Sequence, residues 1–198
     1  MRANVCTDLN DSSRAFLMAV WPKIKMACGG GDIRPVEILD DIEIAKQLDT
    51  LAGIDVWQTK TDIGVRGIAS RVQFGDKAWN TFTIRLARES GSATEYEKRL
   101  DAIETGRFIY PYLTVQAYVT ARNNPTLLSC AVCKTKDLYG FVEYRKTIEN
   151  PIKPKKSIDK TTGQWATFYC VDWLELKKWC NLKPGSKPHI KIWTSLTD

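Results

Sequence analysis

The sequence predicts an α/β (α+β) fold in which helices flank a central mixed β-sheet. Helix-like and strand-like segments follow one another in the order helix, strand, strand, strand, helix, strand, strand. Hydrophobic residues make up 43% of the 198 residues, which is enough for a substantial core. Between residues 65 and 86, polar side chains recur at alternate positions, and this pattern predicts strands with one polar face.

The N-terminal segment predicts a helix followed by a linker. Ser12 or Ser13 can cap a helix over residues 14–21, which Pro22 bends or ends unless a second turn restarts through Ala27. Residues 29–31 are all glycine and break any continuation. A phosphate-binding loop would need a preceding strand and a following Gly-Lys-Ser/Thr sequence, and both are missing. We therefore interpret these glycines as a flexible linker.

A second helix is predicted over residues 36–51, with Pro35 at its start. Its apolar stripe has helical spacing and consists of Ile38, Leu39, Ile42, Ala45 and Leu48. Acidic residues, among them Asp41, fill its first half, where the helix dipole favours negative charge. Gly53 ends this helix, and residues 54–59 predict a strand that contains Asp55 near its start.

Strands over residues 65–74 and 81–86 are expected to pair as a hairpin, because Gly75 and Asp76 form a turn signal. One face of this hairpin is apolar, with Ile68, Val72 and Phe74 opposite Phe82, Ile84 and Leu86. The other face is polar, with Arg71 and Gln73 beside Thr81, Thr83 and Arg85. A solvated sheet face is the ordinary explanation of such a pattern. A partly basic face on a central sheet also suits a binding site, and we place the candidate site there.

The second half of the chain continues the same alternation. A capping-box pattern from Ser92 to Glu95 predicts the start of a helix. The further expected elements are strands over residues 113–119 and 127–134 joined by a turn at 123–125, an exposed basic loop over 150–162, a strand over 165–171, a helix from Asp172 to Trp179 and an edge strand in the tail. We divide the chain into an N-terminal helix and linker (1–34), a core (35–149) and a basic loop with a Trp-rich extension packed on the core (150–198).

Composition limits the classes of function. The formal charge of +6 favours anionic partners, nucleic acid before membrane. No apolar run approaches the length of a membrane span, and the N-terminus does not resemble a signal peptide. Six cysteines in a chain of this length do not make a disulfide scaffold. We expect a reducing, cytoplasmic location, without a membrane partner.

Cysteine and histidine offer little support for other chemistry. Cys130 and Cys133 could join Cys170 and Cys180 in a zinc site, but they fall inside an apolar strand and should point to opposite faces. We interpret them as buried structural residues. His189 is the single histidine, which argues against a histidine-based catalytic mechanism.

The residues between 41 and 98 suit Mg²⁺- or Mn²⁺-assisted cleavage of a phosphodiester. Such a reaction needs hard oxygen ligands for the metal and cations that stabilise charge on phosphorus. Asp55 is the best metal ligand, Asp41 a second, and the amide of Gln73 could bind metal or water. Residues expected to bind phosphate are Arg71, Arg85 and Lys98, joined further along the chain by Lys153, Lys155 and Lys156. Trp57 and Trp79 either pack at the sheet edge or stack on bases.

The element order resembles the PD-(D/E)XK nuclease superfamily, over roughly residues 35–145. The resemblance implies a restriction-endonuclease-like core and a metal-dependent nuclease, with Asp55 as the Asp that opens the second strand. The third strand departs from the motif, because it has Arg71-Val72-Gln73 where the family has Glu/Gln-x-Lys. Lys98 and Glu95 could supply a migrated cation and carboxylate. The same combination of segments is similar to uncharacterised phage and mobile-element proteins.

Two hypotheses follow from these observations. The first is a metal-dependent endonuclease, phage- or mobile-element-encoded, in which Asp55, Gln73, Arg71, Glu95 and Lys98 act on DNA, or on RNA as a weaker option. The second is a non-catalytic phage or plasmid protein on a degenerate nuclease fold, which binds nucleic acid or a host factor, for example as an anti-defence inhibitor. A homodimer or a complex with a host protein is compatible with both hypotheses.

Overall fold

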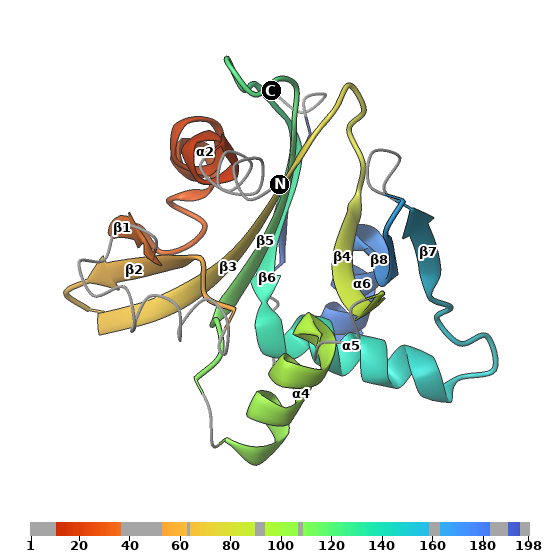
Figure 1. Cartoon of the computed structure of the whole chain (residues 1–198). Coiled ribbons are helices and arrows are strands. Elements are labelled where there is room, and N and C mark those ends of the chain that lie inside the picture. Colours follow the sequence, from red (N-terminus) through yellow and green to blue (C-terminus); the bar gives the residue numbers. More distant parts are fainter. Residues whose placement is uncertain are drawn as a thin grey trace.

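Two β-sheets lie side by side, with helices around them (Figure 1). The computed structural model describes residues 11–36, 53–62, 64–89, 94–106, 109–158, 163–182 and 190–194. The first sheet has six strands in the order β1-β2-β3-β5-β6-β9, and the second has three in the order β4-β8-β7. This mixed α+β arrangement confirms the predicted fold class.

The first sheet forms the centre of the molecule. Its strands are β1 (Asp32–Pro35), β2 (Val56–Lys60), β3 (Gly64–Phe74), β5 (Leu113–Val119), β6 (Leu127–Lys134) and β9 (Lys191–Thr194). Among the strand pairs of the described residues, only β3 and β5 run parallel, because the chain leaves β3 for the second sheet and a helix before it returns as β5. The predicted bounds of β5 and β6 are confirmed, and so is the edge position of the tail strand on β6.

The second sheet corrects the predicted hairpin. Strand β4 (Thr81–Arg88) does not pair with β3 but runs antiparallel to β8 (Trp165–Asp172), with Thr83 opposite Cys170. Strand β3 instead pairs with β5. The physical reason is that the apolar residues expected to face each other enter two different cores. Phe82 packs with Trp173 of the C-terminal helix, whereas Ile68 packs under the N-terminal helix.

Those two cores lie on opposite faces of the first sheet. On one face, η1 (Phe16–Val20) and α2 (Trp21–Ile24) cover the apolar side chains of β3, β5 and β6. On the other side, the second core joins α4 (Glu95–Thr105), α5 (Thr135–Thr147) and α6 (Trp173–Leu182) to the second sheet. No helix within the described ranges is long and apolar enough to cross a membrane.

The N-terminal segment follows one predicted alternative and differs from the prediction in two other ways. The helix continues past Pro22, as the alternative of a second turn allows, because a π-helical turn places this proline in the first turn of α2, where no N–H is needed. Gly31 is packed and not simply a linker residue: its φ is 85°, and a Cβ there would lie 2.4 Å from the backbone oxygen of Thr59. Pro35 is the last residue of β1, an edge strand that was not predicted. The helix expected after Pro35, with Asp41, falls from residue 37 on outside the described residues.

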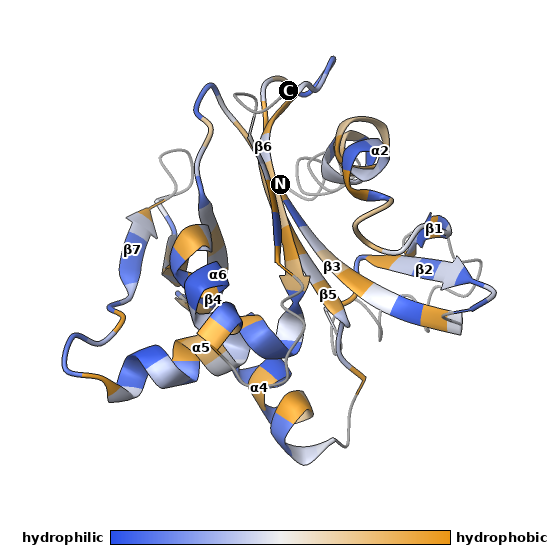
Figure 2. Cartoon of the chain, turned by 180° about the vertical axis from the view of Figure 1, so that it is seen from behind, coloured by the Kyte–Doolittle hydropathy of each residue, from blue (hydrophilic) through white to orange (hydrophobic). Residues whose placement is uncertain are grey.

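The C-terminal half holds two further corrections. Helix α5 directly follows β6 and was not predicted. The basic loop contains a strand, β7 (Lys155–Ile158), which pairs with β8, is exposed along its whole length and is mostly hydrophilic (Figure 2). The start of α6 is confirmed, because the carboxylate of Asp172 accepts hydrogen bonds from the backbone N–H groups of Leu174 and Glu175 at 2.8 and 3.0 Å.

Candidate functional site

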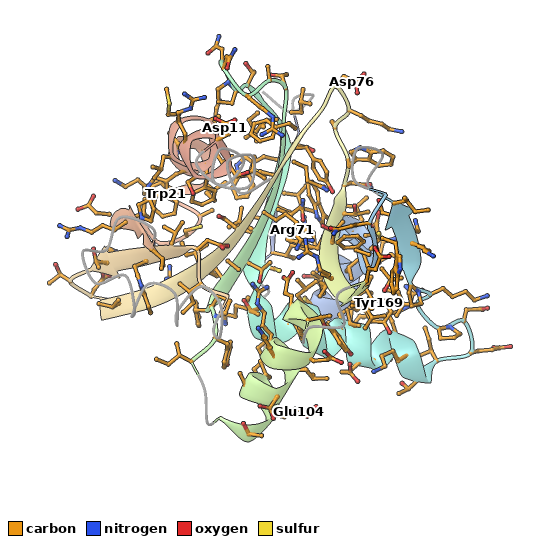
Figure 3. All side chains as sticks on the ribbon, viewed as in Figure 1. Asp11, Trp21, Arg71, Asp76, Glu104 and Tyr169 are labelled. Carbon is orange, nitrogen blue, oxygen red and sulfur yellow. The ribbon has the colours of Figure 1, made fainter. Side chains whose placement is uncertain are left out.

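The polar face of β3 points at the second sheet. Arg71 lies between β3 and β4 (Figure 3). In the parallel register, Arg71 is opposite Gln116 and Gln73 is opposite Tyr118 of β5. Across from them, β4 contributes Thr81, Thr83 and Arg85, and β8 contributes Phe168 and Cys170. The polar residues that were expected on one face of a hairpin therefore face each other from two different sheets.

Arg71 connects the two sheets to helix α4. Its Nη1 donates to the backbone oxygen of Thr83 at 2.9 Å and to the Oγ1 of Thr83 at 3.1 Å. Its Nη2 donates to the carboxylate of Glu95 at 2.8 Å. The side chains of Arg71 and Glu95 are 26% and 21% exposed, so this pair is screened less than a surface ion pair. One guanidinium thus fixes the position of β4 relative to α4.

Glu95 is held between two arginines. Its second carboxylate oxygen accepts from Nη1 of Arg99, whose Nη2 donates to the backbone oxygen of Gly53 at 2.9 Å. Burial favours a higher pKa for Glu95, but the positive charges of Arg99, Arg71 and Arg85 outweigh burial and hold the pKa below its ordinary value. This carboxylate therefore stays ionised well into the acid range.

The predicted capping role of Glu95 is wrong. The residue that caps α4 is Thr94, and the side chain of Glu97 accepts the backbone N–H of Thr94 at 3.0 Å. Both Ser92–Glu95 and Thr94–Glu97 satisfy the capping-box spacing, and the second one forms. Glu95 is consequently available for the ion pairs with Arg71 and Arg99.

Asp55 interacts electrostatically with Arg99, at the Glu95 end of this polar network. Its Oδ2 accepts the backbone N–H of Ser70 at 2.5 Å, which ties the loop before β2 to strand β3. Burial alone would lower the pKa of Arg99, but the negative charges of Glu95 and Asp55 raise that pKa above its ordinary value, so Arg99 remains a cation. The described residues contain no group of three or more His, Cys, Asp or Glu side chains that could hold a metal ion.

A chain of amides and hydroxyls extends from Arg71 in the other direction. The Nε2 of Gln116 donates to the Oε1 of Gln73 at 3.1 Å, and the Oγ1 of Thr83 donates to the Oε1 of Gln116 at 3.1 Å. The hydroxyl of Tyr118 donates to the backbone oxygen of Thr81 at 2.9 Å, and burial raises the pKa of this tyrosine. Gln116 is 1% exposed, so a buried polar side chain is satisfied at this point.

Two arginine side chains lie near the ring of Phe168, beside this network. Its ring centroid is 5.8 Å from the guanidinium carbon of Arg71 and 5.9 Å from that of Arg85. In the sheet register, Phe168 is also the partner of Arg85 on one side and of Lys155 on the other. Two guanidinium groups therefore lie near one aromatic ring, and Lys155 lies opposite that residue in the sheet register.

A pocket of about 430 Å³ opens between the sheets next to this cluster. Its walls come from β3, β4, β5, β7, β8 and the loop that joins β3 to β4. The side chains that give it chemical character are Gln73, Lys77, Trp79, Thr81, Tyr118 and Lys155. Two lysines and one acid, Asp76, line it, so its own charge is positive.

The loop over residues 75–80 is fastened to both sheets. The backbone N–H of Gly75 donates to Val119 at 2.9 Å, and Ser129 donates from its Oγ to the backbone oxygen of Trp79 at 2.6 Å. At the far end, the Nδ2 of Asn80 donates to Asp172 at 2.9 Å. Trp79 is nevertheless 50% exposed, with Lys77 4.0 Å from its ring centroid. The loop thus presents an aromatic side chain from a fixed backbone.

The other predicted binding residues are distributed unequally. Lys155 lines the pocket, whereas Lys156 alternates to the opposite face of β7 and lies 5.0 Å from the ring centroid of Trp165. Lys153 is exposed just before β7, and Lys98 is half-buried on α4, one turn after Glu95. The structure thus brings Lys155 to the pocket and places Lys156 away from it.

Two further expectations concern residues outside the pocket. Cys130 packs in one core and Cys133 in the other, as strand alternation predicts. Trp57 lies within β2, opposite Arg34 and Gly67, and does not line the pocket. Sequence reasoning missed Gln116, Tyr118 and Phe168 of the site. For β5, the alternation of Thr114, Gln116 and Tyr118 was the available signal.

Comparison of the chain with protein-family models, with curated proteins and with solved structures gives no match.

Proposed function

We propose that this protein binds nucleic acid through the pocket and the neighbouring polar face between its two sheets. The observation that carries the proposal is a positively charged pocket lined by Lys77 and Lys155, beside Arg85 and the ring of Phe168. Arginine and lysine suit phosphate oxygens, and aromatic rings suit bases. The formal charge of +6 adds a general attraction to polyanions. We expect DNA to be bound in preference to RNA.

The partners of the carboxylates favour binding over catalysis. Glu95 is neutralised by Arg71 and Arg99, and Asp55 accepts the backbone N–H of Ser70. The guanidinium of Arg99 already binds Glu95, and the charge of Asp55 acts on the same guanidinium. As arranged, the described carboxylates do not fit a divalent metal. The favoured function is therefore that of a non-catalytic nucleic-acid-binding protein.

Fluorescence anisotropy with labelled DNA and RNA tests this proposal. Charge reversal of Lys155→Glu in the pocket should weaken binding about tenfold and reduce the salt dependence by roughly one phosphate contact. The same reversal at Lys177, which is exposed on α6 and does not line the pocket, should leave affinity within about twofold of the original protein. Equal losses for both variants, or absence of binding at low salt, would contradict the proposal and would favour a protein partner.

Metal-dependent cleavage of DNA is the second candidate. One observation favours it: Asp55, Arg71, Gln73 and Glu95, which the sequence predicts as catalytic, belong to one connected polar region. Mg²⁺ or Mn²⁺ would be the cofactor, with Asp55 and Asp41 as the expected ligands. Asp41 lies outside the described residues.

The two candidates can be separated with one pair of variants. Asp55→Asn removes a charge but keeps an acceptor for the N–H of Ser70, and Asp62→Asn makes the same change in an exposed residue. The protein is incubated with single-stranded, duplex and branched DNA in the presence of Mg²⁺ or Mn²⁺. Metal-dependent cutting that only Asp55→Asn abolishes establishes a nuclease. Binding without cutting under any metal establishes the binder.

A further inference from the structure

We infer that the pocket between the sheets accepts one unpaired nucleotide, so that the protein prefers single-stranded nucleic acid to duplex. This inference rests on the proposed function and adds the substrate class. A volume of about 430 Å³ is of the size that holds one small molecule. Proteins that read duplex DNA insert a helix or a β-ribbon into a groove. Here the polar and cationic side chains line a hollow, which a base can enter only when it is unpaired.

The lining suits the two parts of a nucleotide. Trp79 is half-exposed at the pocket and presents a ring on which a base can stack. Gln73 and Thr81 supply amide and hydroxyl groups for the edges of a base. Lys77 and Lys155 supply cations for the adjoining phosphate. The sides of a duplex offer only phosphates to such a pocket, since its bases are stacked inside.

The pocket is built before the ligand arrives. Hydrogen bonds from Gly75, Ser129 and Asn80 anchor the loop that carries Trp79 to both sheets. The hydroxyl of Tyr118 is fixed on Thr81, and the amide of Gln73 is fixed by Gln116. Ordering these groups on binding would cost affinity, and most of that cost is absent here. A preformed aromatic platform is a feature of sites that stack bases.

The segment just before β7 extends the site from the pocket. Lys155 lines the pocket, and Lys153 is exposed two residues earlier in the same basic segment. A strand of nucleic acid that leaves the pocket can therefore keep its phosphates close to positive charge. Lys156 faces the opposite side of the sheet and should contribute less than Lys155.

The test measures anisotropy of a labelled oligonucleotide of about 12 nucleotides, a length within the site sizes of single-strand binders, and of its duplex. We expect the single strand to bind at least tenfold more tightly than the duplex. Trp79→Ala should weaken single-strand binding by roughly 5- to 100-fold, and Trp79→Phe should restore most of it. Lys155→Glu should weaken binding more than Lys156→Glu. Thermal melting of each variant checks that the fold is retained.

The outcomes separate this inference from the function on which it rests. Binding of neither form would overturn the proposed function together with the inference. Equal or tighter binding of the duplex would overturn the inference alone. A preference for single strands that survives Trp79→Ala and Lys155→Glu unchanged would also overturn it, because the pocket would then not be the binding site.

Discussion

The two faces of the central sheet are both covered, yet they have opposite chemistry. Toward η1 and α2, strand β5 presents Leu113, Val115, Ala117 and Val119, which are all buried in an apolar core. Toward the second sheet, the same strand presents Thr114, Gln116 and Tyr118, which are also buried. Central strands covered on both faces are usually apolar throughout. A buried polar face needs hydrogen-bond partners, and here Thr114, Gln116 and Tyr118 have them in Thr135, Gln73, Thr83 and Thr81.

The contrast also appears in how each face is held. The apolar face is stabilised by area removed from water, which is non-directional. The polar face is held by directional bonds from Arg71, Gln116 and Glu95, each of which fixes two elements at once. The apolar face should therefore dominate stability, whereas the polar face should dominate specificity.

The largest effect on stability should come from the apolar face. Phe16→Ala removes a fully buried ring from the core between the N-terminal helix and the sheet. We expect a loss of about 3–5 kcal/mol in the free energy of unfolding, measured by urea denaturation. Met18→Ala on the same helix turn, 66% exposed, should change stability by less than about 0.5 kcal/mol. Similar losses for both variants would mean that this helix does not pack as described.

A smaller effect is expected on the polar face. Glu95→Gln leaves Arg71 and Arg99 without the carboxylate that both of them contact. We expect a loss of about 1–3 kcal/mol, below that of Phe16→Ala because the site retains some solvent contact. Glu104→Gln, exposed at the end of the same helix, is the matched control and should be nearly neutral. If Glu95→Gln leaves the free energy of unfolding unchanged, the two arginines must find other partners at no cost in stability.

The parts of the fold that could be predicted from sequence are those with local signals. Strands β5 and β6, with a turn between them, follow from alternating apolar runs, and the cap at Asp172 follows from residue type. Helix α5 was missed because Lys134, which precedes it, makes no side-chain cap, and because no breaker separates it from β6. The partner of β4 could not be found locally, since pairing depends on which core accepts Phe82 and Ile84.

The residues of the candidate site also fall into two groups, those with a local sequence signal and those without one. Arg71, Gln73 and Glu95 were found because unusual polar residues stand out on short apolar strands and at a helix start. Gln116 and Tyr118 were missed although they alternate with apolar residues along β5, and Phe168 was missed because a phenylalanine gains cationic neighbours only through the tertiary fold. Arg99 was also missed, since an arginine within a helix is ordinarily exposed, whereas here its side chain is 8% exposed.

The smallest expected effect is the pH dependence of the difference between the original protein and Glu95→Gln. The pKa of Glu95 is lower in the folded state than its ordinary value of 4.5, because Arg99 and Arg71 outweigh burial. Below that value the unfolded chain takes up a proton that the folded protein still excludes, so the contribution of Glu95 to stability falls with pH. This contribution is fully present above the ordinary pKa and is lost as pH falls through the folded pKa.

The unfolding free energies of both proteins, measured between about pH 6 and pH 3, should therefore converge as the pH falls. A difference that stays constant over this range would mean that the ion pairs do not favour the ionised carboxylate, and the polar face would then be held by neutral hydrogen bonds alone.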